Sequence, residues 1–288
     1  MSQRKQQILP KLSLALLPIF IFIVFFGFFF LYPIGKVIYL SFIANDGSFT
    51  LSNFQTALKF PYSKGFIGSL KLGLITAILS AIPGAIIAYI ISTKGSPRLK
   101  NIIASMNGVL ANTGGIPLAF AFTAAIGING YLTRLLKDYG LDIYAGNFAL
   151  GTFGGITLVY LYFQIPLMII IFSPAIGVIR NEWREAASNL GANKLAFWRL
   201  IGGPLLLPSF IASFLLLFAN GFSAYATANA LTVGNVPLTP LQIAGLLNGN
   251  VSANQMNLGK ALAVLMILIS ALAIIPYLVI QKRVERWQ

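Results

Sequence analysis

Side chains that could carry out covalent or acid–base chemistry are scarce in this sequence of 288 residues. It contains no Cys, no His and only six Asp and Glu residues. Disulfides and thiolate metal sites are therefore excluded, and no convincing nucleophile–base pair or carboxylate pair can be assembled. The pattern G-x-x-x-x-G-K-[ST], which cradles ATP phosphates, is also absent. We expect no enzyme activity, no metal and no cofactor, and if the chain drove an energy-requiring process, the energy would have to come from a partner.

The most charged segment of the chain, residues 181–208, lies between two long apolar runs. We expect Asn181 to cap a helix there, with Glu182 and Glu185 in its first turn, where the helix dipole favours anions. Gly191 then permits the chain to turn. Four residues at i, i+3, i+4 and i+7 predict one apolar helix face, built largely of small side chains: Trp183, Ala186, Ala187 and Leu190.

After the turn, Leu195, Trp198 and Ile201 predict a second short helical piece that runs back towards the membrane. A helix–Gly–helix elbow with alanines on its contact face allows another backbone to approach closely, as a partner would require. The alternative is an amphipathic loop resting on lipid headgroups, with Trp183 and Trp198 as interfacial anchors. The periodicity alone favours this second interpretation.

Composition places the chain in a membrane. Hydrophobic residues make up 57% of the sequence and charged residues only 9%, whereas soluble domains carry roughly 25% charged residues. The net charge of +14 could suggest nucleic acid, but the basic residues are spread over short loops and termini, so we expect no nucleic-acid partner. We predict an all-α membrane protein with one domain over residues 1–288 and spans near 12–31, 66–92, 102–127, 150–172, 204–228 and 261–280.

The interruptions within these spans are Gly and Pro residues, and Pro33 with Gly35 marks the expected end of the first. The connection between spans five and six carries no charge and contains a weakly apolar stretch at 241–247, expected to be a short helix at the outer surface or dipping into the bundle. A short amphipathic piece is expected around Tyr131–Tyr139.

Basic residues predict the orientation. With six spans, both termini lie on the same side as the 181–208 segment. That side holds 13 of the 20 Lys and Arg residues, and cytoplasmic loops are the basic ones. We therefore expect both termini to be cytoplasmic in a multi-pass protein of the bacterial inner membrane. The 13 residues are Arg4, Lys5, Lys11, Lys94, Arg98, Lys100, Arg180, Arg184, Lys194, Arg199, Lys282, Arg283 and Arg286.

No Asp, Glu, Arg or His lies in the middle of any predicted span. An ion-coupled secondary carrier usually needs an ionisable group there, because protonation or cation binding must change a buried charge. That function class is disfavoured but stays open, as does a non-transporting scaffold subunit of a membrane complex.

A sequence pattern in the charged segment resembles the EAA loop of binding-protein-dependent ABC importer permeases of type I. The family pattern is E-A-A, three residues, G, nine residues, I-x-L-P. This chain matches it in register at Glu185, Ala186, Ala187, Gly191 and, further on, at Ile201 and Pro204. It departs at Gly203, which replaces the usual Leu and is expected to loosen the packing of the second helical piece.

The resemblance extends over the whole chain and is closest to the spermidine/putrescine-type group, which includes permeases for aminoethylphosphonate, ferric iron, thiamine and sulfate. It implies a six-span permease that forms the solute pathway, with the coupling loop at 181–204. The implied partners are a cytoplasmic ABC ATPase dimer, a second permease subunit that is a related but different chain, and an extracytoplasmic solute-binding protein. The residues implied in ATPase coupling are Trp183, Arg184, Glu185, Ala186, Ala187 and Gly191.

Within that set, Ala186 and Ala187 are expected to make the close contact and Gly191 the bend, while Glu185 holds the elbow's own shape by an ion pair or cap. Trp183 and Arg184 contact either the ATPase or lipid headgroups.

Polar residues inside the spans are the only candidates for the solute pathway. The alternative role for each is an interhelical hydrogen bond, which polar residues in bundles commonly make. The substrate stays open: the outer loops lean slightly towards an anion, and selectivity in this family often belongs to the binding protein. The pathway candidates are Asn112, Thr113, Gln164, Asn220, Ser223 and Tyr225.

Overall fold

The computed structural model describes residues 9–285, except 45, 147, 233 and 249–254. Within this part of the chain, six helical stretches are long and apolar enough to cross a membrane. Apart from one isolated bridge between Ile43 and Phe49, the same residues contain no β-structure. The predicted all-α fold with six membrane helices is therefore confirmed. The six stretches are Leu17–Ser41, Tyr62–Thr93, Ile116–Asp138, Phe153–Ile176, Lys194–Ser223 and Met256–Lys282.

The first span does not end at Pro33, and that expectation was wrong. Helix α1 (Leu9–Phe26) passes through a π-helical turn, η1 (Gly27–Leu31), directly into α2 (Tyr32–Ser41). Pro33 stands in the first turn of α2. The π-turn just before it replaces the regular i→i−4 backbone hydrogen bonds that a proline would disrupt, so the helix continues. None of the most apolar window of this span is buried within the chain.

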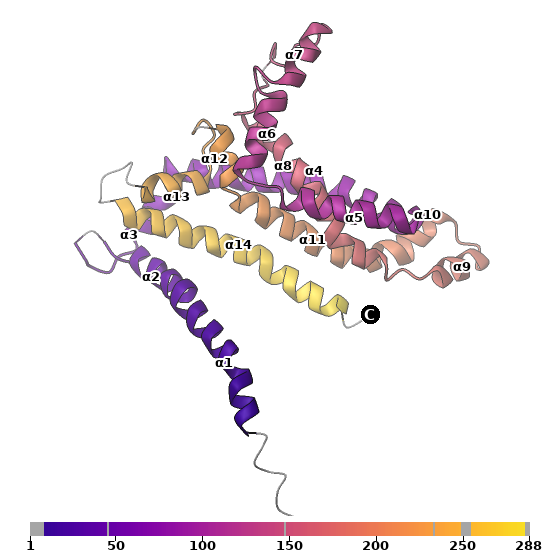
Figure 1. Cartoon of the computed structure of the whole chain (residues 1–288), viewed down its shortest axis with the longest axis horizontal. Coiled ribbons are helices and arrows are strands. Elements are labelled where there is room, and N and C mark those ends of the chain that lie inside the picture. The colour runs from indigo at the N-terminus through magenta and orange to yellow at the C-terminus, as the bar shows by residue number, and fades with distance from the viewer. Residues whose placement is uncertain (1–8, 45, 147, 233, 249–254, 286–288) are drawn as a thin grey trace, which may run out of the picture.

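The expected third span, 102–127, is interrupted near Gly114 and Gly115, as the sequence predicts, and forms two helices. Helix α5 stops at Asn112, and α6 begins at Ile116 after Gly115 adopts a φ of +82°, a backbone conformation that glycine reaches without strain. Helices α6 and α7 then stand away from the main bundle (Figure 1). The bounds in this region are α3 Ser52–Ala57, α4 Tyr62–Lys94, α5 Pro97–Asn112, α6 Ile116–Ile126 and α7 Tyr131–Asp138.

The second half of the chain contains the fourth to sixth spans and the charged segment. The fifth span is a continuous helix from Lys194 to Ser223, and the expected short helix near 241–247 is present as α13. The bounds are α8 Phe153–Ile176, α9 Asn181–Asn189, α10 Lys194–Phe197, η2 Trp198–Gly202, α11 Gly203–Ser223, α12 Ala226–Thr232, α13 Thr239–Leu247 and α14 Met256–Glu285.

Four helices form the centre of the bundle, because α4 packs on both α8 and α11, and α11 packs on α14. Glycines bring these helices close together. A Cβ atom on Gly73 would lie 3.0 Å from the backbone nitrogen of Phe222, and one on Gly84 would lie 2.6 Å from Cβ of Met168. Small residues of this kind allow membrane helices to pack at short distance.

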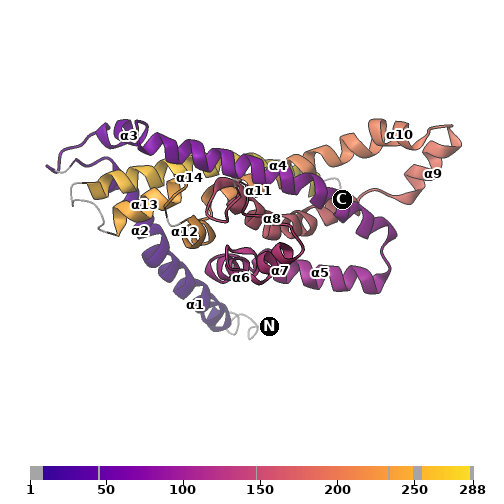
Figure 2. The same cartoon turned by 90° about the horizontal axis from the view of Figure 1, so that it is seen from above.

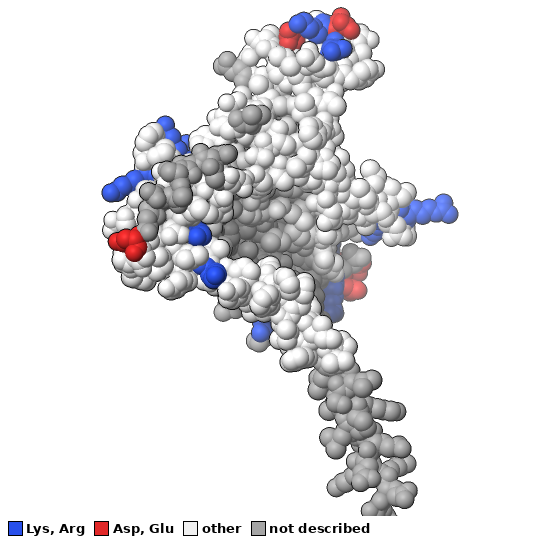
Figure 3. Space-filling model, turned by 60° about the vertical axis from the view of Figure 1, so that its left-hand side comes forward, with Lys and Arg blue, Asp and Glu red and all other residues white. Residues whose placement is uncertain are grey.

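The long helices run roughly side by side, so the bundle has two ends. Helices α9 and α10 lie at one end, and α3 and α13 lie at the other (Figures 1 and 2). On the face seen in Figure 3, charged side chains lie mainly towards the projecting ends, and most of the surface between them is uncharged. The few charged residues, 9% of the sequence, thus lie mainly where a membrane protein is expected to carry them.

Candidate functional site

The charged segment folds into a helix–turn–helix elbow at one end of the bundle. Helix α9 ends at Asn189, with Leu190 as its C-cap. The backbone N–H of Gly191 then donates to Ser188 O at 2.9 Å, and that of Ala192 donates to Ala187 O at 2.9 Å. This pair of bonds is the Schellman arrangement, which requires a left-handed residue at its centre. Gly191 has a φ of +79°. The expected bend therefore lies at Gly191.

The expectation that Asn181 caps α9 was wrong. The N-cap position belongs to Arg180, whose side chain makes no capping bond, and Asn181 is the first helical residue. The second helix is capped instead, because the backbone N–H of Ala196 donates to Asn193 Oδ1 at 2.8 Å. Asn193 stands just before the expected second piece, and N-cap preference alone could have identified it.

The apolar face of α9 is divided between the interior and the surface. Ala187 is only 6% exposed and packs into the same cluster as Phe197 and Leu206. Ala186 is exposed, and Leu190 is 88% exposed. We expected both alanines to contact a partner. Ala187 instead packs against its own chain, and only Ala186 is accessible to a partner.

A shallow groove of about 530 Å³ separates α9 from the start of the fifth span. All four residues of the predicted apolar face line one wall of it, and η2 and α11 supply the other wall. Apolar residues left exposed in a groove are typical of an interaction site. The lining residues are Trp183, Ala186, Ala187, Leu190, Leu200, Ile201 and Leu205.

Charged residues of α9 have different surroundings. The Arg184 guanidinium lies over the rings of Tyr89 and Phe197, at 5.7 and 5.8 Å from their centroids, so it ties α9 to α4 and α10 by cation–π contact. Glu185 is exposed. The ion pair or cap expected for Glu185 is absent among the described residues, which leaves its carboxylate available at the surface.

Gly203 does not loosen the second helical piece as expected. A Cβ atom there would lie 2.6 Å from the carbonyl oxygen of Trp198, and one on Gly202 would lie 2.8 Å from the Trp198 ring. The π-turn η2 brings these backbones together, and only glycine fits. The Gly in place of the usual Leu therefore makes this junction tight, and the elbow continues rigidly into α11.

Gln164 is fully buried where α4, α8 and α11 meet. Its amide nitrogen donates to Thr76 Oγ1 at 3.0 Å, and its oxygen accepts from Ser80 Oγ at 3.2 Å. A Cβ atom on Gly221 would lie 2.7 Å from Gln164 Nε2. Gln164 thus makes the interhelical hydrogen bonds that were the alternative to a pathway role.

Replacing Gln164 by Leu is expected to lower stability and leave the KM for solute unchanged. Thr76 and Ser80 also donate to carbonyls of their own helix, so the loss is modest, about 0.5–1.5 kcal/mol. Thermal unfolding of the purified complex in detergent, together with uptake kinetics, measures both quantities. A large rise in KM with normal stability would contradict this assignment and return Gln164 to the pathway.

The other pathway candidates lie at two breaks in the helices. Asn112 and Thr113 end α5, and their side chains bond to carbonyls of their own helix. Asn220 is half-buried near the end of α11, while Ser223 and Tyr225 are exposed beside the break between α11 and α12. A surface position suits a pathway, so these five residues stay candidates. The five are Asn112, Thr113, Asn220, Ser223 and Tyr225.

Contacts that the sequence did not reveal join the two breaks to each other and the second break to α8. The Gly115 backbone N–H donates to Thr227 Oγ1 at 2.8 Å, and Tyr160 donates from its hydroxyl to Ala224 O at 3.0 Å. Gly115 and Thr227 are 112 residues apart, so no local pattern could have paired them.

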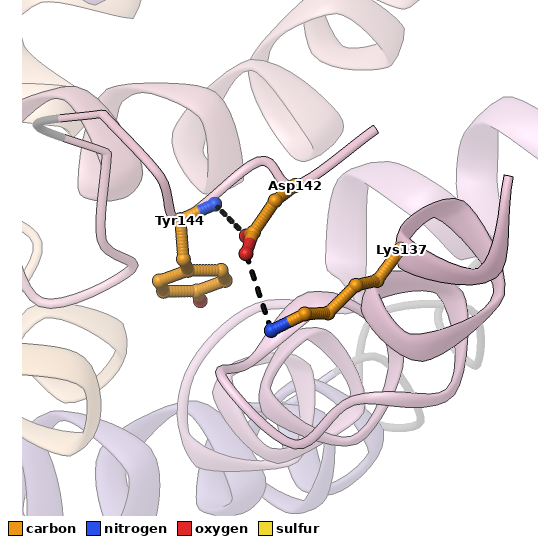
Figure 4. A network of polar contacts seen from close by, with 3 residues as sticks. All are labelled: Lys137, Asp142 and Tyr144. Carbon is orange, nitrogen blue, oxygen red and sulfur yellow. Dashed lines mark hydrogen bonds and ion pairs between the residues drawn. The ribbon is translucent and has the colours of Figure 1, made fainter. Parts of the chain in front are cut away.

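The tip of α7 is held by a small polar network (Figure 4). Lys137 Nζ pairs with Asp142 Oδ2 at 3.2 Å, and the backbone N–H of Tyr144 donates to Asp142 Oδ1 at 2.9 Å. The Tyr144 bond and then Lys137 hold the pKa of the Asp142 carboxyl below its usual range. This network closes the loop after α7 and is far from the elbow (Figure 1).

A family model described as "binding-protein-dependent transport system inner membrane component" matches residues 62–288. The chain is 28% identical to the spermidine/putrescine transport system permease protein PotB of Haemophilus influenzae, over 73% of this chain and 77% of that protein. It is 27% identical to a probable sulfate transport system permease protein, cysT, of Helicosporidium, over 60% of this chain and 61% of that protein.

A third relative is the sn-glycerol-3-phosphate transport system permease protein UgpA of Agrobacterium fabrum, 25% identical over 89% of this chain and 91% of that protein. Among solved structures, a chain of a bacterial ABC transporter that imports alginate superimposes with a TM-score of 0.67 and 16% identity. That match covers 96% of this chain and 95% of the other. This superposition shows that the two chains share a fold.

Proposed function

We propose a coupling mechanism for this chain, which belongs to the family of binding-protein-dependent transport system inner membrane components. It is the permease subunit of an ABC importer and a multi-pass membrane protein. In our proposal the elbow, α9 with Gly191 and α10, docks on a cytoplasmic ABC ATPase. The observation that carries the proposal is the groove beside α9, which leaves Ala186 and Leu190 exposed at one end of the bundle.

The docking surface fits a close contact with another protein. Ala186 is small and exposed, and no atom lies within 4 Å of the space beside Gly191. A partner backbone can approach both positions. The exposed Glu185 carboxylate adds a polar anchor at the rim, and Trp183 supplies an aromatic wall of the groove, a residue type enriched in protein interfaces.

The elbow can transmit a movement because it is fastened to the bundle. Ala187 packs in the core, Arg184 lies over Tyr89 of α4, and η2 continues into α11. Helix α11 contacts α4, α8 and α14. A push on α9 when the ATPases close on ATP would therefore tilt several spans together rather than bend one loop, as rigid-body transitions do.

The rest of the assembly follows from this orientation. The basic residues favour a cytoplasmic elbow with both termini on the same side of a bacterial inner membrane. A second permease subunit completes the pathway and covers part of the exposed first span. A solute-binding protein docks at the outer end, near α13. ATP hydrolysis belongs to the ATPase, since this chain has no P-loop.

Affinity purification of the tagged chain in mild detergents, followed by mass spectrometry, tests these partners. We expect an ABC-type ATPase and a second permease to be recovered. The ATPase should be lost from an Ala186→Trp variant, in which a bulky side chain occupies the contact. Equal recovery of the ATPase with that variant, or none in several mild detergents, would contradict docking at the elbow.

A further inference from the structure

At the end of the bundle opposite the elbow lies a second cavity, of about 720 Å³. The first turns of α4 and α8 and the segment before α13 enclose it, and it opens to the surface. Its volume lies within the range of small-molecule sites. None of the residues singled out for the solute pathway lines it. The lining residues are Lys64, Ile67, Gly68, Lys71, Ala149, Gly151, Thr152, Phe153, Asn235, Val236 and Pro237.

Two lysines give this cavity its charge. Lys64 and Lys71 are seven residues apart on α4, so they lie on one face of the helix, about 10 Å apart along its axis. Lys64 Nζ stands 4.8 Å above the centroid of the Phe60 ring at the rim. Lys71 is about two turns further along α4, within the candidate membrane span Tyr62–Thr93, and both side chains are exposed. The cavity is thus positively charged at its mouth and along its wall.

Neither lysine has a carboxylate partner among the described residues, and no Asp or Glu lines the cavity. Asp46 bonds to Ser48, Asp142 pairs with Lys137, and Glu182 and Glu185 are at the elbow. An ionisable residue inside a membrane span is costly, and it is usually paired or part of a solute pathway. Because both lysines are exposed, an anion that is not part of this chain can reach their ammonium groups.

The wall facing the lysines also suits an anion. Thr152 and Phe153 stand at the amino end of the 24-residue helix α8, where free backbone N–H groups and the helix dipole favour negative charge. The Thr152 hydroxyl accepts the Gly155 N–H at 3.4 Å. The remainder of the wall is apolar, with Ile67, Phe153 and Val236. Such a cavity holds a charged head beside an apolar or neutral body.

We infer that this cavity is an outward-facing binding site for the oxyanion group of the transported solute, a phosphate, sulfate or carboxylate held by Lys71 and Lys64. The inference rests on the proposed function and assigns a substrate class to it. A polycation is excluded as the occupant, because it would place positive charge against two uncompensated ammonium groups. Lys71 supplies one contact to the oxyanion and Lys64 the other.

Chemical labelling tests the site without requiring transport. The full complex, in discs of phosphatidylcholine, is treated with a membrane-impermeant lysine acylating reagent, and acylation at each lysine is quantified by mass spectrometry. Sulfate, inorganic phosphate and glycerol 3-phosphate are compared with chloride and putrescine at equal ionic strength. Lys59, which is exposed on the same side but outside the cavity, is the internal control.

At an oxyanion concentration ten times its Kd, we expect acylation of Lys71 to slow about tenfold relative to Lys59, since protection follows 1 + [L]/Kd. Chloride and putrescine should give no selective protection. Equal slowing of Lys71 and Lys59 in all salts would overturn the inference. A second set of discs containing phosphatidylglycerol identifies the other source of an oxyanion: protection by that lipid alone would assign the cavity to a headgroup and overturn the solute site.

Uptake kinetics provide the second arm. Lys71→Gln should raise the KM for the transported solute about tenfold or more, as expected for loss of a charge-assisted bond, with Lys71→Arg restoring most of it. Lys59→Gln should leave uptake unchanged. A transported solute that is neutral or cationic, with normal kinetics in Lys71→Gln, overturns the inference. If the complex transports no solute at all, the proposed function fails, and the labelling result still decides whether the cavity binds oxyanions.

Discussion

Replacing Gly191 by Asp is expected to abolish solute uptake while the chain still inserts and assembles its spans. Among the described residues, no atom lies within 4 Å of a Cβ at this position, so the new side chain meets no steric obstacle from them. The left-handed backbone, with a φ of +79°, costs an Asp about 1 kcal/mol. Loss of uptake would therefore reflect a blocked approach of the ATPase and not a misfolded elbow.

Gly140 provides a matched control for this substitution. It follows α7 with a φ of +82° and also has open space at its Cβ. Its N–H donates to Lys137 O, and that of Leu141 donates to Leu136 O, the same Schellman arrangement as at Gly191. Gly140→Asp should leave uptake intact, because α7 is far from the elbow (Figure 1). Normal uptake by a well-expressed Gly191→Asp variant would contradict the coupling role.

The second large effect is expected at Gly221, where three spans meet. A Cβ atom there would stand 2.7 Å from both Gln164 Nε2 and Thr76 Oγ1, and 3.3 Å from Cα of Gly73. Valine would force α11 away from α4 and α8, at a cost of about 1–3 kcal/mol for an overpacked contact, and would break the Gln164 network. We expect lower thermal stability and a loss of ATP-dependent uptake.

Thermal unfolding in detergent measures the Gly221→Val effect, and Gly108→Val is the control. Gly108 is helical, within α5, and no atom lies within 4 Å of its Cβ, so valine there incurs the same change in helix propensity without the clash. Equal destabilisation by the two substitutions would show that the close approach at Gly221 does not hold the spans together.

The elbow could be predicted from the sequence because its signals are local. Gly191 at the end of an apolar-faced helix predicts the turn, and the structure has its left-handed residue at that position. What the pattern could not supply was the division of the two alanines. Ala187 is buried because it packs with Phe197 of α10 and Leu206 of α11, whereas Ala186 stays exposed.

The spans were predictable as apolar runs, but their breaks were less so. Gly114 and Gly115 indicate an interruption without giving its direction, and α6 leaves the bundle there because Thr227 holds Gly115 from another helix. Hydropathy likewise could not show that Gln164 is enclosed, since Thr76 and Ser80 lie more than 80 residues away. Contacts between distant segments could be identified only from the three-dimensional structure. The same holds for the cavity with Lys64 and Lys71.

The proposed coupling mechanism requires a direct contact between α9 and an ATPase, and the sequence allows that contact to be trapped by crosslinking. It contains no Cys, so Ala186→Cys carries a unique thiol at an exposed position of α9. A thiol-linked photocrosslinker there should join the permease to the ATPase subunit in the purified complex, whereas the same reagent at Gly140→Cys should not. Crosslinks from Ala186 to lipid alone, in a complex that contains the ATPase and transports solute, would contradict the coupling role of the elbow.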